Sequence, residues 1–157
     1  MTRKHGVRFL CLSAMIAALY LALTLLFQAV SFGAVQFRVS EALTLLPVLF
    51  PQAVPGLTLG CLLANLLAGA NVYDVIFGTL ATCAAAFCTW RLRKNVWLAA
   101  LPPVLLNGVI IGLVITYAYG VNALWLNVLT VALGEGAVCY GLGVPMCKGL
   151  EKLNWKG

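Results

Sequence analysis

Four isolated charged residues mark the places where this chain is best equipped for chemistry. Between Arg8 and Lys148 the sequence carries one basic cluster, at 91–94, and otherwise only Arg38, Glu41, Asp74 and Glu135. Each of the four lies in or beside an apolar run, where an ionisable side chain costs several kcal/mol unless it is paired, solvated or used. Carboxylates accept hydrogen bonds and a guanidinium donates them, so this set suits the binding of a polar solute.

The chemistry that the sequence lacks argues against an enzyme. There is no Gly-x-x-x-x-Gly-Lys phosphate loop, no nucleophile with a histidine partner and no metal-ligand spacing, and the single histidine, His5, lies in a basic tail. The six cysteines fall in apolar segments without a Cys-x-x-Cys pair, as packing residues in a reducing compartment do. No catalytic residue, metal, cofactor or disulfide is expected.

The composition indicates an integral membrane protein. With 63% hydrophobic and 9% charged residues, the chain has too little polar surface to cover a soluble globule. The first apolar run, 9–30, is longer than the roughly 7–15 apolar residues of a signal peptide, which predicts a retained first helix. The net charge of +6 comes from basic residues that flank apolar runs, a distribution typical of cytoplasmic loops and not of nucleic-acid binding.

The arrangement of prolines and basic loops predicts six helices in one bundle. The stretch 41–69 is too long for one span and is interrupted by Pro47, Pro51 and Pro55, which break a helix interior. Counting it as a hairpin of two short passes places the basic N-terminus, the 91–94 cluster and the C-terminal lysines on one side, as the positive-inside rule requires. We therefore expect an all-α, six-helix transmembrane domain spanning 1–157 with both termini cytoplasmic, its helices at about 9–30, 41–50, 57–69, 75–90, 96–119 and 124–147.

This topology gives the isolated charges a shared location. Arg38, Glu41 and Asp74 fall at the outer face, while Glu135 lies in the middle of the last helix between two glycines, which let another group approach closely. Asn107 has the equivalent depth in the fifth helix, so we expect a polar pocket that opens outward. The predicted substrate-binding residues are Arg38, Glu41, Asn71, Asp74, Asn107, Tyr117, Trp125 and Glu135.

Most of these residues also have a purely structural interpretation. Arg38 and Glu41 have the spacing of an ion pair at a helix start, and Asp74 has the position of a helix cap. Asn107 suits an interhelical hydrogen bond, and aromatic residues such as Tyr117 and Trp125 are common at membrane interfaces. Glu135 has neither a basic residue at helical spacing nor a capping position, and it is the strongest functional candidate.

Small residues recur every four positions on the first helix. Ala14, Ala18 and Ala22 form a face on which another helix can approach closely. The pattern alone fits either packing inside the bundle or docking of a partner. We favour docking.

The segment 35–47, which contains Arg38-Val39-Ser40-Glu41, resembles the hallmark of QueT-type proteins. Asn65, Ala70 and the Gly78-Thr79-Leu80-Ala81-Thr82 stretch are also similar to that family, and the resemblance covers essentially the whole chain. These proteins are the substrate-binding S components of energy-coupling-factor (ECF) transporters for queuosine precursors. The resemblance implies a multi-pass protein of the bacterial plasma membrane with an outward-facing pocket under the first outer loop. It also implies docking on a transmembrane coupling subunit through Ala14, Ala18 and Ala22, with ATP hydrolysed by two separate ATPase subunits.

The ligands implied by this resemblance are 7-deazaguanines: queuine, or its 7-cyano and 7-aminomethyl precursors. Their guanine-like edge offers paired donors to a carboxylate, and an aminomethyl arm is cationic and suits a second one. Glu135 and either Glu41 or Asp74 fit these two roles, Arg38 or an asparagine can donate to O6, and an aromatic ring can stack on the base. Two alternatives remain: an S component for another vitamin or micronutrient, and a structural membrane protein without a transport role.

Overall fold

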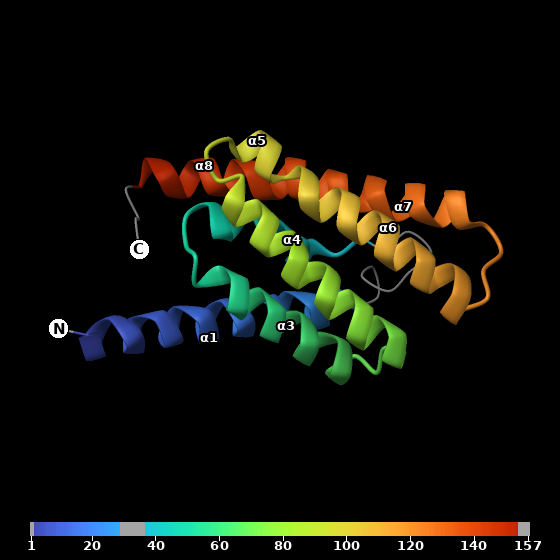
Figure 1. Ribbon diagram of the computed structural model, residues 1–157, viewed down its shortest axis with the longest axis horizontal. Helices are drawn as coiled ribbons and strands as arrows, with labels where there is room; N and C mark the ends of the chain where they lie inside the picture. The colour runs from blue at the N-terminus through green and yellow to red at the C-terminus, as the bar shows by residue number, and fades with distance from the viewer. Residues whose placement is uncertain (1, 29–36, 154–157) are drawn as a thin grey trace.

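The computed structural model describes residues 2–28 and 37–153, and every regular element in this part of the chain is helical. The elements form six helical segments, because η2 runs directly into α4, α5 into α6, and α7 through η3 into α8 (Figure 1). The expected all-helical, six-helix membrane bundle is confirmed. The bounds are α1 Thr2–Leu26, η1 Val39–Val48, α3 Ala53–Leu67, η2 Asp74–Gly78, α4 Thr79–Arg91, α5 Val96–Ala99, α6 Leu101–Ala118, α7 Leu124–Val138, η3 Cys139–Gly143 and α8 Val144–Lys152.

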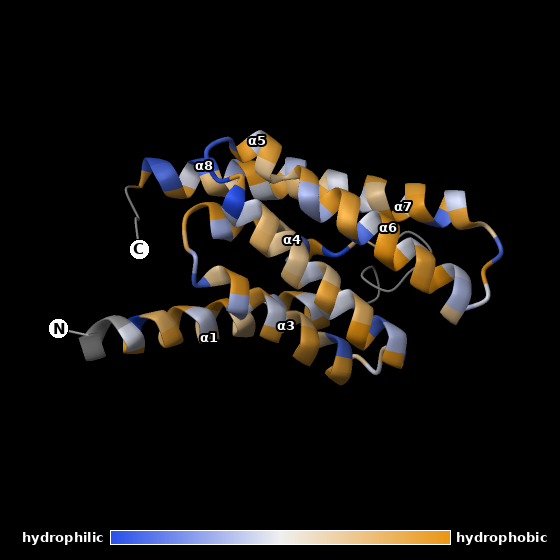
Figure 2. Cartoon of the chain, viewed as in Figure 1, coloured by the Kyte–Doolittle hydropathy of each residue, from blue (hydrophilic) through white to orange (hydrophobic). Residues whose placement is uncertain are grey.

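Three helical segments are long and apolar enough to cross a bilayer. They are Gly6–Leu26, Val96–Ala118 and Leu124–Lys152, and the apolar helices Val39–Val48 and Ala53–Leu67 are shorter. Hydrophobic residues run along most of the length of the helices (Figure 2). Many large apolar side chains are exposed on the outside of the bundle, which is the surface expected to face lipid.

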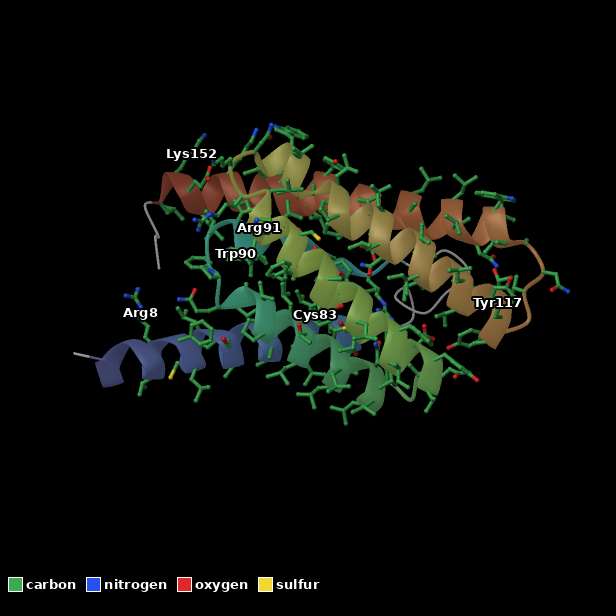
Figure 3. All side chains as sticks on the ribbon, viewed as in Figure 1. Arg8, Cys83, Trp90, Arg91, Tyr117 and Lys152 are labelled. Carbon is green, nitrogen blue, oxygen red and sulfur yellow. The ribbon has the colours of Figure 1, made fainter. Side chains whose placement is uncertain are left out.

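The start of α1 and the end of α8 lie at the same end of the bundle (Figure 1). The labelled basic residues Arg8, Arg91 and Lys152 gather at that end, and Tyr117 lies at the opposite one (Figure 3). The loop between α4 and α5, which carries the basic cluster, is hydrophilic (Figure 2). The positive-inside rule predicts that this basic end faces the cytoplasm and that the loop at Gly120 lies at the outer end.

The second helical segment, η1, crosses the bundle core as a 3-10 helix. Its ten residues rise about 20 Å at roughly 2.0 Å each, compared with about 15 Å for an α-helix of the same length. Three residues per turn place Glu41, Thr44 and Pro47 on one face. Residues 40–48 are all buried, because α1, α3, α4 and η3 surround the segment. A short pass is therefore shielded from lipid by its neighbours.

Glycines bring the helices of two pairs into close contact. A Cβ atom on Gly56 of α3 would lie 2.6 Å from the carbonyl oxygen of Ser13, and one on Gly60 would lie 2.9 Å from that of Ala17. On α6, a Cβ on Gly112 would lie 2.6 Å from a methyl carbon of Val128 on α7. These approaches draw α1 to α3 and α6 to α7, which positions the polar side chains described below.

The helix bounds differ from the sequence expectation mainly at irregular points. The first helix begins at Thr2 and not at residue 9, and residues 29–30 of its expected range lie outside the described residues. α3 begins at Ala53, before Pro55, because a proline is tolerated in the first helical turn, where its missing N–H has no intrahelical acceptor. The last segment continues to Lys152 through the π-helical turn η3.

Candidate substrate-binding site

Polar side chains from all six helical segments meet inside the bundle. Each segment contributes at least one, and every member is at most 4% exposed to solvent. Burying so many polar groups in an apolar bundle is costly unless they satisfy one another or a ligand. We call this set the polar cluster; its members are Tyr20, Arg38, Glu41, Asn65, Thr82, Asn107 and Glu135.

Glu41 has more side-chain contacts than the other acid of the polar cluster. The Tyr20 hydroxyl donates a hydrogen bond to its Oε1 atom. The side chains of Asn107 and Thr82 also approach this carboxylate, and Arg38 interacts with it electrostatically. Its second oxygen, Oε2, has no hydrogen-bond partner among the described residues. Glu41 is therefore held in place while one acceptor atom stays available.

Glu135 has fewer partners. Asn107 donates from Nδ2 to Glu135 Oε1 across 3.2 Å, and Oε2 lacks a hydrogen-bond partner within the part of the chain that the structure describes. Asn107 also approaches the carboxylate of Glu41, so the two acids lie on either side of one amide. The sequence analysis had placed Asn107 and Glu135 at the same depth, and the structure brings these two side chains into contact.

Arg38 links the acids to the outer end of the bundle. It immediately precedes η1, and its guanidinium donates from Nη2 to Asn65 Oδ1 at 3.1 Å. The same amide donates from Nδ2 to the backbone oxygen of Asp74 at 3.1 Å. Arg38 also interacts electrostatically with both Glu41 and Glu135. The Arg38 guanidinium therefore interacts with both acids and not with Glu41 alone.

Asp74 begins the π-helical turn η2 and is fully buried. Its Oδ2 atom accepts a hydrogen bond from the Tyr119 hydroxyl, and its Oδ1 atom has no partner among the residues described. Partial burial, and then this hydrogen bond, raise the pKa of Tyr119, so the phenol keeps the proton that it donates. The capping role considered for Asp74 is carried by Asn71, whose Oδ1 accepts the Tyr73 backbone N–H at 3.1 Å.

The two aromatic candidates lie apart from the polar cluster. Tyr117 is 78% exposed and Trp125 is 79% exposed. Tyr117 lines an apolar groove of about 610 Å³ between η2 and α6, together with Tyr73, Phe77, Ile110, Leu113, Val114 and Ala118. The structure therefore brings together four of the eight expected binding residues: Arg38, Glu41, Asn107 and Glu135. Asp74 reaches this group through its backbone oxygen, which accepts from Asn65, while its carboxylate accepts from Tyr119. Asn71, Tyr117 and Trp125 lie outside that set.

The sequence analysis did not include Tyr20, Thr82 or Tyr119 among the site residues. Tyr20 carried a usable signal, because a phenol in the middle of an apolar helix normally faces a hydrogen-bond partner. Asn65 had drawn notice through the family resemblance alone. Thr82 lies in the stretch that resembles the family, but its residue type did not mark it as a site residue, since a threonine in a helix can satisfy its hydroxyl locally.

Two faces of α1 carry small residues, and they have different surroundings. Ser13 and Ala17 are buried against the glycines of α3, and Ser13 Oγ donates to the backbone oxygen of Gln52 at 2.9 Å. Ala14, Ala18 and Ala22 are exposed on the outside of the bundle. The internal seam of α1 therefore uses a neighbouring set of small residues.

Comparison with known proteins agrees with this architecture. Residues 10–152 match the family model described as "QueT transporter". The chain belongs to the QueT transporter family. This membership and the apolar helices identify a multi-pass membrane protein of a transporter family.

One curated relative of the family is named "Queuosine precursor transporter QueT", from Lactococcus lactis subsp. cremoris (strain MG1363). It is 41% identical over 71 residues, which cover 44% of this chain and 41% of the relative. The match thus spans less than half the length of that relative. No solved structure matches the chain significantly.

Proposed function

We propose that this protein is the substrate-binding S component of an ECF-type importer in a bacterial plasma membrane, and that it takes up a 7-deazaguanine queuosine precursor. Membership of the QueT transporter family, the name of the Lactococcus relative and the six-helix bundle support this proposal. The S component receives the ligand from outside and delivers it through a separate coupling subunit. ATP hydrolysis belongs to two further ATPase subunits.

The observation that carries the proposed site is the pair of half-satisfied carboxylates. Glu41 and Glu135 each have one hydrogen-bonded oxygen and one oxygen without a partner among the described residues. A network that only joined helices would gain from satisfying both, because buried acceptors without partners cost about 1–3 kcal/mol each. A guanine-like edge offers N1–H and an exocyclic amine, the donors that such oxygens require. Arg38 supplies a donor for O6.

Access to the polar cluster lies at the outer end of the bundle. Arg38, Glu41 and Glu135 are each at most 4% exposed, so a base-sized ligand requires the outer helix ends to separate. The hydrogen bond between Tyr119 and Asp74 joins the end of α6 to η2 and lies on this path. The first outer loop, under which the pocket was expected, was predicted at 31–40, and its residues 31–36 lie outside the described residues.

The coupling subunit docks on the exposed alanine face of α1 in this proposal. Small side chains let two helices approach closely, and such packing drives helix association in a bilayer, where apolar contact with lipid is equally favourable. The exposure of Ala14, Ala18 and Ala22 supports this assignment, because the bundle leaves their face available. The buried seam at Ser13 and Ala17 holds the bundle together independently.

Mass spectrometry of the ligand released from gently purified protein tests the proposed function. We expect a 7-deazaguanine at close to one molecule per chain, and co-purification of a coupling subunit and two ATPases from the native host. A different bound micronutrient would keep the receptor role and reject the substrate class. Purification without any ligand or ATPase partner, together with no binding of added deazaguanines, would support the structural alternative.

A further inference from the structure

The polar cluster contains more negative than positive groups. Among the described residues it holds two carboxylates, Glu41 and Glu135, and one guanidinium, Arg38. Arg38 interacts electrostatically with both acids. Asp74, also fully buried, contacts the polar cluster through its backbone oxygen, which accepts from Asn65, while its carboxylate accepts from the Tyr119 hydroxyl. One guanidinium therefore serves two buried acids in a medium of low polarity, so a cationic ligand group would complete the site.

The two acids of the polar cluster are not equivalent. Glu41 accepts from Tyr20, is approached by Asn107 and Thr82, and interacts electrostatically with Arg38. Glu135 accepts one hydrogen bond, from a neutral amide, across 3.2 Å. Glu135 therefore has fewer donors than Glu41. Its open oxygen is the acceptor that gains most from a positive partner.

Building on the proposed function, we propose that Glu135 recognises the positive charge of the ligand. Its carboxylate pairs with the ammonium group on the 7-substituent, and Glu41 accepts the donors of the guanine-like edge. This assignment gives each acid one task and separates the recognition of the base from the recognition of its side arm. Glu135 is then the residue that determines specificity among 7-deazaguanines.

The assignment predicts a preference between two ligands of similar size. A 7-aminomethyl arm is cationic and donates hydrogen bonds to Glu135. A 7-cyano arm is neutral and can only accept, so it places acceptor against acceptor and leaves the carboxylate uncompensated. The secondary amine of queuine shares the charge of the aminomethyl arm. The protein should therefore favour the two cationic ligands over the nitrile.

Binding isotherms of purified protein with the 7-aminomethyl and 7-cyano compounds test this inference. In wild type we expect the aminomethyl compound to bind at least about tenfold tighter, because a charge-assisted hydrogen bond is involved. Glu135→Gln should bring the two affinities to within about threefold of each other, chiefly by weakening the aminomethyl compound. Glu41→Gln should weaken both compounds by similar factors. Glu151→Gln is the matched control, since Glu151 is exposed on α8 and its loss changes the net charge equally.

Each outcome of this experiment decides something. Equal wild-type affinities for the two compounds would overturn the inference while leaving the proposed function intact, whereas no binding of either compound would reject the proposed function. If Glu135→Gln lowers both affinities in parallel, Glu135 does not recognise the positive charge of the ligand. Thermal unfolding of each variant in detergent checks the fold, and Glu135→Asp, which keeps the charge, should retain the preference for the aminomethyl compound. Loss of that preference in a folded Glu135→Asp protein would also contradict the assignment.

Discussion

Asn107 on α6 donates a hydrogen bond to Glu135 on α7, with 3.2 Å between Nδ2 and Oε1. The same amide approaches the carboxylate of Glu41, so one neutral side chain lies against both acids of the polar cluster. The contact depends on the close packing of α6 and α7, where Gly108 and Gly112 bring the two helices together. Asn107 therefore positions Glu135 beside Glu41 and Arg38.

Asn107→Ala should impair ligand binding. Removing the amide leaves Glu135 without the donor that orients it, and a lost hydrogen bond to a buried charged acceptor costs about 1–3 kcal/mol. We expect a weaker isotherm for a 7-deazaguanine together with a lower unfolding temperature. Asn127→Ala is the matched control, because Asn127 is also buried and donates to Thr116 Oγ1 at 2.9 Å and to the Val121 backbone oxygen at 3.0 Å, away from the polar cluster. Unchanged binding by Asn107→Ala, or equal loss in both variants, would show that Asn107 serves only helix packing.

Tyr20→Phe should also weaken ligand binding, and Tyr117→Phe should not. Tyr20 is 1% exposed and donates to Glu41, so its loss leaves a buried carboxylate with one donor fewer, at a cost of about 1–3 kcal/mol. Tyr117 is largely exposed and lines the apolar groove. Ligand titration of the two variants compares the two locations. A binding defect confined to Tyr117→Phe would move the site to the groove.

Ala18→Trp should separate the protein from its coupling subunit without harming the pocket. Ala18 is exposed, so the larger side chain disturbs a partner helix and not the bundle. We expect uptake and pull-down of the coupling subunit to be lost. Ligand affinity of the isolated protein should stay within about threefold, or roughly 0.7 kcal/mol.

Ala17→Trp is the control for this prediction. Ala17 is the adjacent residue but is buried, and its backbone faces Gly60 of α3. Overpacking this seam should lower thermal stability and ligand affinity together. If Ala18→Trp shows the same joint loss, the alanine face packs inside the bundle and does not dock a partner.

The two ends of the bundle should react differently with membrane-impermeant thiol reagents. Asn122, in the loop between α6 and α7, and Lys94, in the loop between α4 and α5, are both exposed. These two loops lie at opposite ends of the bundle (Figure 1). In a background lacking the native cysteines, Asn122→Cys in intact cells should be labelled from outside, and Lys94→Cys should react only after the membrane is opened. The reverse pattern would contradict the orientation given by the positive-inside rule.

The sequence predicted the fold well because membrane insertion depends on simple quantities. The length of apolar runs, the breaks at Pro47, Pro51 and Pro55 and the distribution of basic residues determine the six helices. The 3-10 geometry of η1 could not be predicted, because burial among four neighbouring elements overrides local propensity there. The π-helical turns η2 and η3 were not predicted either.

The candidate site was predicted as far as charge alone allows. Four charged residues were predicted because burying a charge in an apolar run is costly unless it is paired or used: Arg38, Glu41, Asp74 and Glu135. Asn107 was predicted because it lies at the same depth in its helix as Glu135. The partner of each acid depends on helix rotation, which the sequence does not specify. Tyr20 and Thr82 could therefore not be paired with Glu41, and the exposure of Tyr117 and Trp125 could not be distinguished from pocket-facing positions.

A ligand-bound structure, with a 7-deazaguanine added to the purified protein, tests the central claim most directly. The proposed site predicts density for the base beside Arg38 and Glu41, with the 7-substituent directed at Glu135. Density for the ligand in the apolar groove beside Tyr73, Phe77 and Tyr117, with the hydrogen bond from Asn107 to Glu135 unchanged, would contradict it.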